Sequence, residues 1–351
     1  MNELKLPFYV QLVVVLLGIS LFILFLVEAG AILRPLLYAV FFALLLHPLC
    51  TRFERWKLSR TLSALFCVLI PSSIIGAVLF FISSQFSTFS DSLPVLQDKI
   101  NLVSGNMMHF LETKLHVTND KLMNYLNDSV VKLLDQSGTI VSYVVTSISS
   151  SFISFFLFSI YLFFTLYYRR ECKQFILDIF QYKRRELVEG ILTKIQLMVR
   201  SYVTGVLIVV VIVGVLNSLG LLILGVEYAI FFGVLASILN LIPYIGILIG
   251  ALVTMLFTLI TKESIWPSIG AGLIFLGVHL LEANVITPKI VGSKVNLNPF
   301  SAVLGLIIWH AIWGISGMVL AIPLVAMFKI ICDAVDPLKP IGALLGKSKP
   351  R

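Results

Sequence analysis

The stretch from Gly225 to Lys262 constrains the fold most, because it is apolar almost throughout and yet interrupted at its centre. The interruption contains Asn240, Pro243 and Gly246. Each apolar arm beside it has about 15 residues, whereas a membrane-spanning helix needs roughly 20. Two arms of this length predict a helical hairpin over 228–261 that enters the membrane and turns back. The alternative is a pair of short spans joined by a tight turn at the surface.

The composition points to a membrane protein. Hydrophobic residues make up 59% of the 351 residues and charged residues only 13%, against roughly 25% charged in soluble domains. We therefore expect an all-α polytopic membrane protein of about 8 transmembrane segments, including two broken or re-entrant helical hairpins in inverted repeat. The net charge of +8 is placed at helix ends, which favours contact with anionic lipid headgroups over nucleic acid.

The order of polar and apolar segments predicts five regions. These are transmembrane helices 1–3 in 1–85, an extracytoplasmic amphipathic helical insert in 86–138, transmembrane helix 4 and a basic cytoplasmic interfacial helix in 139–200, a transport core in 201–330, and a basic cytoplasmic tail in 331–351. The apolar stripes of the insert need cover. Either they lie on the bilayer surface or on each other, or they pack against neighbouring subunits.

Charge bias orients the chain. Basic residues cluster in 52–60, in 169–200 and from Lys329 onward, which places these segments and both termini in the cytoplasm. The apolar run 300–330 is too long for one untilted span, and it is interrupted around Gly314 to Gly317 and later by Pro323. If this run is a second hairpin, the basic tail stays in the cytoplasm. A span followed by a hairpin then occurs twice with opposite orientation, as in secondary transporters.

Polar side chains inside the predicted spans are candidates for function, because an unpaired polar group in lipid is costly. Asn240 lies at the first break, Asn217 lies in the predicted span 201–224, and Glu282 and Asn284 lie at the end of the span 265–281. For each amide, helix–helix hydrogen bonding is the structural alternative. For His279 and His310 a structural role is favoured over a proton relay.

Backbone carbonyls freed at the two breaks would coordinate a cation or a hydroxylated solute. Gly246 and Gly250 form a GxxxG pattern that predicts close helix packing. The predicted binding residues are Asn217, Asn240, Pro243, Gly246, Glu282, Asn284, Pro288, His310, Gly314 and Gly317. No HExxH or GxSxG motif occurs in the sequence, and we expect neither an enzyme, a cofactor nor a bound metal.

The run Asn240-Leu241-Ile242-Pro243-Tyr244-Ile245-Gly246 resembles the central signature of the autoinducer-2 exporter family of bacterial permeases. Later motifs extend the resemblance, namely Glu282, Pro288, the connection from Gly292 to Pro299, Trp313-Gly314-Ile315-Ser316-Gly317 and Ala321-Ile322-Pro323. The resemblance implies a homo-oligomer of the bacterial inner membrane, with a pentamer as a working stoichiometry, that transports a small solute. Family members are associated with autoinducer-2 export and with sodium(lithium)/proton antiport.

Three functions follow as hypotheses. The first is gradient-driven export of a small polar solute such as autoinducer-2. The second is sodium(lithium)/proton antiport, which requires an essential carboxylate; the candidates Glu227, Glu263 and Glu282 all lie near segment ends, which favours a neutral or hydroxylated solute. The third is a passive channel or a membrane scaffold, which predicts flux without saturation or no flux.

Overall fold

The computed structural model describes residues 7–91, 153–180, 184–241, 245–262, 264–291 and 296–346. Every element within these ranges is helical, and six of the helices are long and apolar enough to cross a membrane. The prediction of an all-α polytopic membrane protein is confirmed. Most of the predicted insert 86–138 lies outside the described residues, and its first residues belong to a long helix that ends at Asp91.

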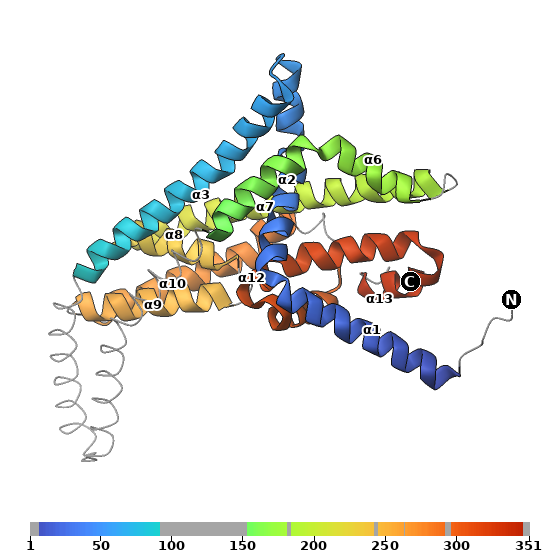
Figure 1. Ribbon diagram of the computed structural model, residues 1–351. Coiled ribbons are helices and arrows are strands. Elements are labelled where there is room, and N and C mark those ends of the chain that lie inside the picture. Colours follow the sequence, from blue (N-terminus) through green and yellow to red (C-terminus); the bar gives the residue numbers. More distant parts are fainter. Residues whose placement is uncertain are drawn as a thin grey trace, which may run out of the picture. The chain divides into compact units, whose positions relative to one another are not determined.

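The helices follow one another in the order shown in Figure 1. They are α1 (Phe8–Glu28), α2 (Gly30–Arg55), α3 (Arg60–Asp91), the helix Ile153–Tyr167, α6 (Arg169–Ile179), α7 (Arg185–Ile223), α8 (Ala229–Leu239), α9 (Ile245–Thr261), α10 (Trp266–Leu281), the π-helix η2 (Glu282–Ile286), α11 (Thr287–Ile290), α12 (Pro299–Ala334), the 3-10 helix η3 (Asp336–Leu338) and α13 (Lys339–Leu345).

The chain divides into two compact units. The α12 unit comprises Met1–Val68, Ser154–Thr204 and Val291–Arg351, and the α8–α9 unit comprises Leu69–Ile153 and Gly205–Ile290. The two helix–break–helix segments predicted from sequence therefore belong to different units. Each is described by itself below.

The first hairpin consists of α8 and α9, which pack against each other within the α8–α9 unit. A Cβ atom on Gly246 would lie 1.8 Å from the Leu239 carbonyl oxygen, and one on Gly250 would lie 2.6 Å from the Ala236 Cβ. Only glycine allows the two helices to approach this closely. The predicted packing role of the GxxxG pattern is confirmed, while Pro243, inside the break, lies outside the described residues.

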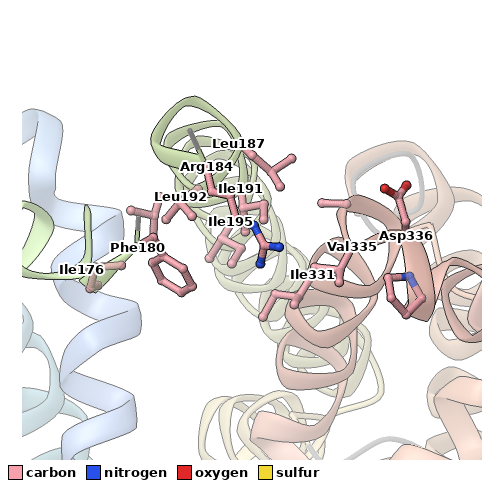
Figure 2. Close-up of a pocket in the computed structure, with 13 residues that line it drawn as sticks. Ile176, Phe180, Arg184, Leu187, Ile191, Leu192, Ile195, Ile331, Val335 and Asp336 are labelled. Carbon is pink, nitrogen blue, oxygen red and sulfur yellow. The ribbon is translucent and has the colours of Figure 1, made fainter. Parts of the chain in front are cut away.

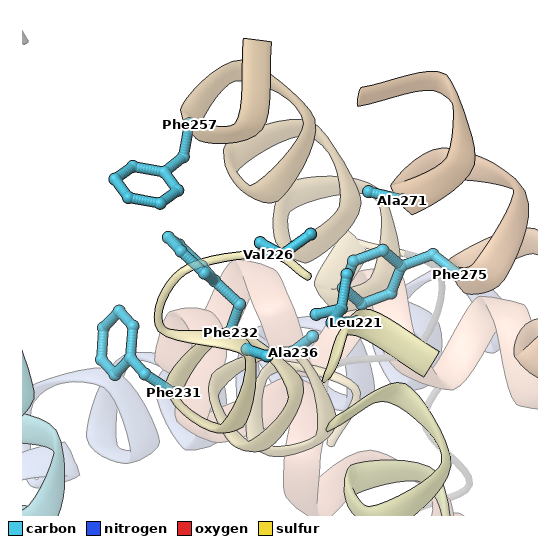
Figure 3. Packing of buried hydrophobic residues seen from close by; sticks show 9 residues of the cluster. Leu221, Val226, Phe231, Phe232, Ala236, Phe257, Ala271 and Phe275 are labelled. Carbon is cyan, nitrogen blue, oxygen red and sulfur yellow. The ribbon is translucent and has the colours of Figure 1, made fainter. Parts of the chain in front are cut away.

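Aromatic side chains form the core of this unit (Figure 3). The rings of Phe232 on α8 and Phe257 on α9 lie with their centroids 4.9 Å apart. Leu221 of α7 and Phe275 of α10 are buried in the same cluster. The hairpin is thus held by a packed core that includes its neighbouring helices, and burial of such rings contributes strongly to packing.

The second hairpin is α12, whose helical geometry is interrupted at Trp313 and Gly314. Gly314 has φ 60° and ψ −139°, a conformation that is accessible essentially only to glycine. The arms on either side fold together, because a Cβ on Gly305 would lie 2.6 Å from a methyl group of Val325. The interruption predicted around Gly314 is confirmed as a hairpin bend.

Helix α13 contacts both ends of this hairpin. At the start of α12, the Asn298 side-chain amide donates to the Leu344 carbonyl at 2.6 Å, and the Asn298 N–H donates to the Leu345 carbonyl at 3.0 Å. Near the end of α12, Asp333 forms an ion pair with the buried Lys329 and lies against Gly342 of α13. We call this arrangement the α13 clasp.

The bend of α12 is also anchored to the first two helices. The Trp313 indole N–H donates to the Leu26 carbonyl at 2.8 Å, and the Tyr38 hydroxyl donates to the Ser316 carbonyl at 3.1 Å. Leu26 is in the last turn of α1, where carbonyls lack partners within the helix. The hydrogen bonds therefore satisfy backbone groups while fixing the bend.

Some helix boundaries differ from those predicted. Pro323 was expected to interrupt the last apolar run, but it lies inside α12, as Pro35 lies inside α2. Proline is tolerated in membrane helices because neighbouring groups satisfy the freed backbone atoms. Helix α7 also runs without a break through residue 200, where the sequence suggested a change from an interfacial helix to a span.

Candidate functional site

The helix that begins as α10 does not end at Leu281. It continues as the π-helix η2 and then as α11, reaching Ile290. The span predicted to end at residue 281 therefore extends further, since nothing in the sequence before Pro288 stops the helix. A π-helical turn is uncommon and often occurs at functional sites. Here its first residue is Glu282.

Asn240 lies opposite this turn. It is the C-cap of α8, and its backbone N–H still bonds to the Ala236 carbonyl at 2.9 Å. Its side-chain amide donates to Oε1 of Glu282 at 2.7 Å. A hydrogen bond to a carboxylate is stronger than one between neutral groups. The break of the first hairpin is thereby joined to the π-helical turn of a helix that lies 42 residues further along the chain.

The second oxygen of Glu282 has a different environment. Oε2 is buried and has no hydrogen-bond partner among the described residues, although the Glu282 side chain is 13% exposed as a whole. Nδ1 of His279 lies 3.7 Å from Oε2, which is longer than a hydrogen bond. Nδ1 of His279 is also buried and without a partner in this part of the chain.

These two polar atoms face each other at 3.7 Å, and each lacks a hydrogen-bond partner among the described residues. Burial of one unsatisfied polar atom costs about 1–3 kcal/mol. A proton on Nδ1 would place a positive charge beside the carboxylate oxygen. A solute hydroxyl or a small cation would have to reach Oε2 from another side, because a gap of 3.7 Å holds no heavy atom between the two groups.

Asn217 occupies a second polar position, on α7. Its side chain is buried, and Oδ1 has no hydrogen-bond partner among the described residues. The same is true of Oγ of Ser218, which packs against Gly233 of α8 so closely that a Cβ there would lie 2.2 Å away. Among the described residues, no hydrogen bond joins Asn217 to Asn240 or Glu282, so Asn217 lies apart from their contact.

The other predicted residues that the structure describes lie outside the contact between Asn240 and Glu282. Asn284 is exposed, and its amide donates to the Leu280 carbonyl of its own helix at 2.8 Å. Pro288 is exposed on α11, and Gly246 serves the packing of the first hairpin. His310, Gly314 and Gly317 belong to the α12 unit, where His310 is exposed and Gly317 packs against the Trp309 carbonyl.

Asn240 and Glu282 are thus the two predicted residues that the structure brings into contact. A structural role was expected for His279, whereas the structure places this side chain beside the unpartnered oxygen of Glu282. The spacing of three residues between them was the available signal, because residues three apart share a helix face.

The comparisons with known proteins agree with the fold. The model of a family described as "AI-2E family transporter" matches residues 11–336. The protein named "Putative transport protein YhhT" of Escherichia coli (strain K12) is 26% identical over 342 residues, which cover 97% of this chain and 93% of that protein. The "AI-2 transport protein TqsA" of the same strain is also 26% identical, over 340 residues that cover 95% of this chain and 93% of that protein.

Proposed function

Because the chain belongs to the AI-2E transporter family, we propose that it exports a small polar solute, such as autoinducer-2, across the bacterial cytoplasmic membrane and that an ion gradient drives this export. The protein is a multi-pass membrane protein of a transporter family. The substrate, the driving gradient, a homo-oligomeric assembly and cytoplasmic termini are parts of the proposal.

One observation carries the proposal, namely the buried Oε2 of Glu282 that has no partner among the described residues. It lies beside the break of a helical hairpin, in the kind of interrupted structure where transporters bind solutes. Asn240 holds the other oxygen and so fixes the direction of the carboxylate. A hydroxylated solute that donates to Oε2 would gain a hydrogen bond to a charged acceptor, a bond of about 1.5–3 kcal/mol.

A second candidate function is sodium(lithium)/proton antiport. The position of Glu282 in the structure supports this candidate. The sequence placed this carboxylate near the end of a span, which argued against an ion-binding role. In the structure, Glu282 lies within a continuous apolar helix of 25 residues, Trp266–Ile290, and a histidine lies beside it. An intramembrane carboxylate next to a histidine is able to exchange a proton for a cation.

Proteoliposomes with an internal pH dye separate the two functions. Sodium, lithium and then an autoinducer-2 type solute are added in turn to vesicles that contain the purified protein. Proton movement that requires the solute and saturates with its concentration supports the proposed export. Proton movement triggered by sodium or lithium alone establishes antiport instead. Solute flux that never saturates and needs no gradient would point to a passive channel and overturn both.

A further inference from the structure

The α12 unit contains an open pocket with a volume of about 500 Å³, which lies within the range of roughly 300–1,000 Å³ for small-molecule sites. Its walls come from α6, from the first turns of α7 and from the end of α12 with the turn after it (Figure 2). Apart from Arg184 and Asp336, every lining residue is apolar. Leu187 and Ile191 face Ile331 and Val335 across the space.

The two charged residues of the wall are not equivalent. Asp336 has a side chain that is 87% exposed and is paired with Lys339 at 2.6 Å. The hydrogen bond from the Lys339 ammonium holds the pKa of Asp336 below its usual range, so this carboxylate is already neutralised by its own cation. Arg184 has no acidic partner among the described residues, and Figure 2 shows its guanidinium directed in among the apolar side chains.

Two nearby cations among the described residues do have partners. Arg185, the next residue, lies 3.9 Å from the Asp178 carboxylate, and Lys173 lies 2.6 Å from Glu189. The Arg184 side chain is exposed and beside the apolar wall, so its guanidinium is accessible to an anion. Phosphate matches the planar set of donors of a guanidinium. The ligand that fits is therefore an amphiphile with an anionic phosphate at one end and an apolar chain.

The surroundings favour a lipid over a soluble anion. Helix α6 carries exposed apolar side chains beside the pocket, with Phe175 at 67% and Ile179 at 61% exposure. Amphipathic helices with basic and apolar faces lie in the interfacial layer of a bilayer. The positive charges of 169–200 predict the cytoplasmic leaflet, which is rich in anionic lipid. We propose that the pocket binds one anionic phospholipid, with an acyl chain along the apolar wall and the phosphate at Arg184.

Lipid binding to the full-length protein tests this proposal without any measurement of transport. Native mass spectra are recorded in a neutral detergent with phosphatidylglycerol, and with phosphatidylcholine as the zwitterionic reference. We expect one phosphatidylglycerol bound in preference to phosphatidylcholine. Arg184→Gln should reduce the affinity for it by about tenfold. Arg185→Gln removes the same charge one residue away, outside the pocket wall, and should leave the affinity unchanged.

A second variant tests the apolar wall. Ala334 lines the pocket, and Ala334→Leu reduces its volume while keeping Arg184; we expect weaker phosphatidylglycerol binding at unchanged net charge. If this variant fails to fold, the paired arginine variants still decide the matter.

Four results would overturn the proposal. One is equal loss of binding in Arg184→Gln and Arg185→Gln, and another is equal binding of both lipids. A third is displacement of phosphatidylglycerol by inorganic phosphate, which would mark a site for a free anion. The fourth is a changed oligomeric state of Ala334→Leu with normal lipid binding, which would mark a contact between copies.

Discussion

The side-chain amide of Asn240 and the carboxylate of Glu282 are joined by a hydrogen bond of 2.7 Å, although 42 residues separate them in the chain. The bond connects the end of α8 to the start of the π-helical turn. It fixes one carboxylate oxygen and leaves the other directed toward His279. The first two predictions follow from this asymmetry.

Replacement of Asn240 by alanine removes the donor to Oε1 of Glu282. Loss of a charge-assisted hydrogen bond of about 1.5–3 kcal/mol should lower solute-dependent flux in proteoliposomes by about tenfold or more, while the protein remains folded. The matched control is Asn284→Ala, because Asn284 is exposed and, among the described residues, its amide bonds to the Leu280 carbonyl of its own helix. If Asn240→Ala shows wild-type flux, the end of α8 takes no part in transport.

Glu282→Gln keeps the shape of the side chain and an acceptor for Asn240 but cannot exchange a proton. We expect proton movement to be lost in the pH-dye assay and exchange of labelled solute to fall as well, because an amide NH2 replaces the Oε2 that accepts a hydrogen bond from the solute. Glu227→Gln is the control, since Glu227 is exposed in the turn before α8. Proton movement that persists in Glu282→Gln would show that another group carries the coupling ion.

Gly246→Ala tests the close approach of α8 and α9. The added methyl group would lie 1.8 Å from the Leu239 carbonyl oxygen, so the hairpin must open or shift. We expect a loss of about 1–3 kcal/mol in stability, as for other overpacked sites, measured as a lower midpoint of thermal unfolding in detergent. Gly277→Ala is the control, because no described atom lies within 4 Å of its added Cβ. Equal midpoints for the two variants would contradict the packing described here.

Trp313→Phe tests the anchor of the α12 bend. The change leaves an aromatic ring but removes the N–H that donates to the Leu26 carbonyl at 2.8 Å. We expect the free energy of unfolding to fall by about 0.5–1.5 kcal/mol, measured by thermal or chemical unfolding. Trp266→Phe serves as the control, because Trp266 is 74% exposed at the start of α10. If both variants unfold at the same midpoint, the bond to Leu26 contributes nothing measurable.

Much of the fold could be predicted because membrane helices leave strong signals. The break near Asn240 followed from two arms that are too short to span, and the bend at Gly314 followed from a run that is too long for one span. Both interruptions involve glycine at a position of close approach or positive φ. Pro323 did not interrupt the last apolar run as expected, because membrane surroundings tolerate proline within a helix.

The sequence predicted Asn240 and Glu282 as binding residues, but it did not predict that they contact each other. Each was predicted because it is a polar residue within an apolar segment. Asn284 was predicted for the same reason, but in the structure it is exposed and lies outside this contact. The π-helix was not predictable, because Glu282–Ile286 contains neither glycine nor proline and its i→i+5 hydrogen bonds have no clear sequence signature. That turn decides which side chains face α8.

The α13 clasp has a consequence for the order of assembly during synthesis. Every contact between α8 and α9 lies within 229–261, so that hairpin can close while the rest of the chain is still being made. The two ends of α12 contact Gly342 and Leu344–Gly346, which the ribosome adds after both arms. Chains generally fold in the order in which they emerge. The α12 hairpin therefore acquires its final contacts last, and a translation stop before Gly342 would leave Asn298 and Asp333 without those partners.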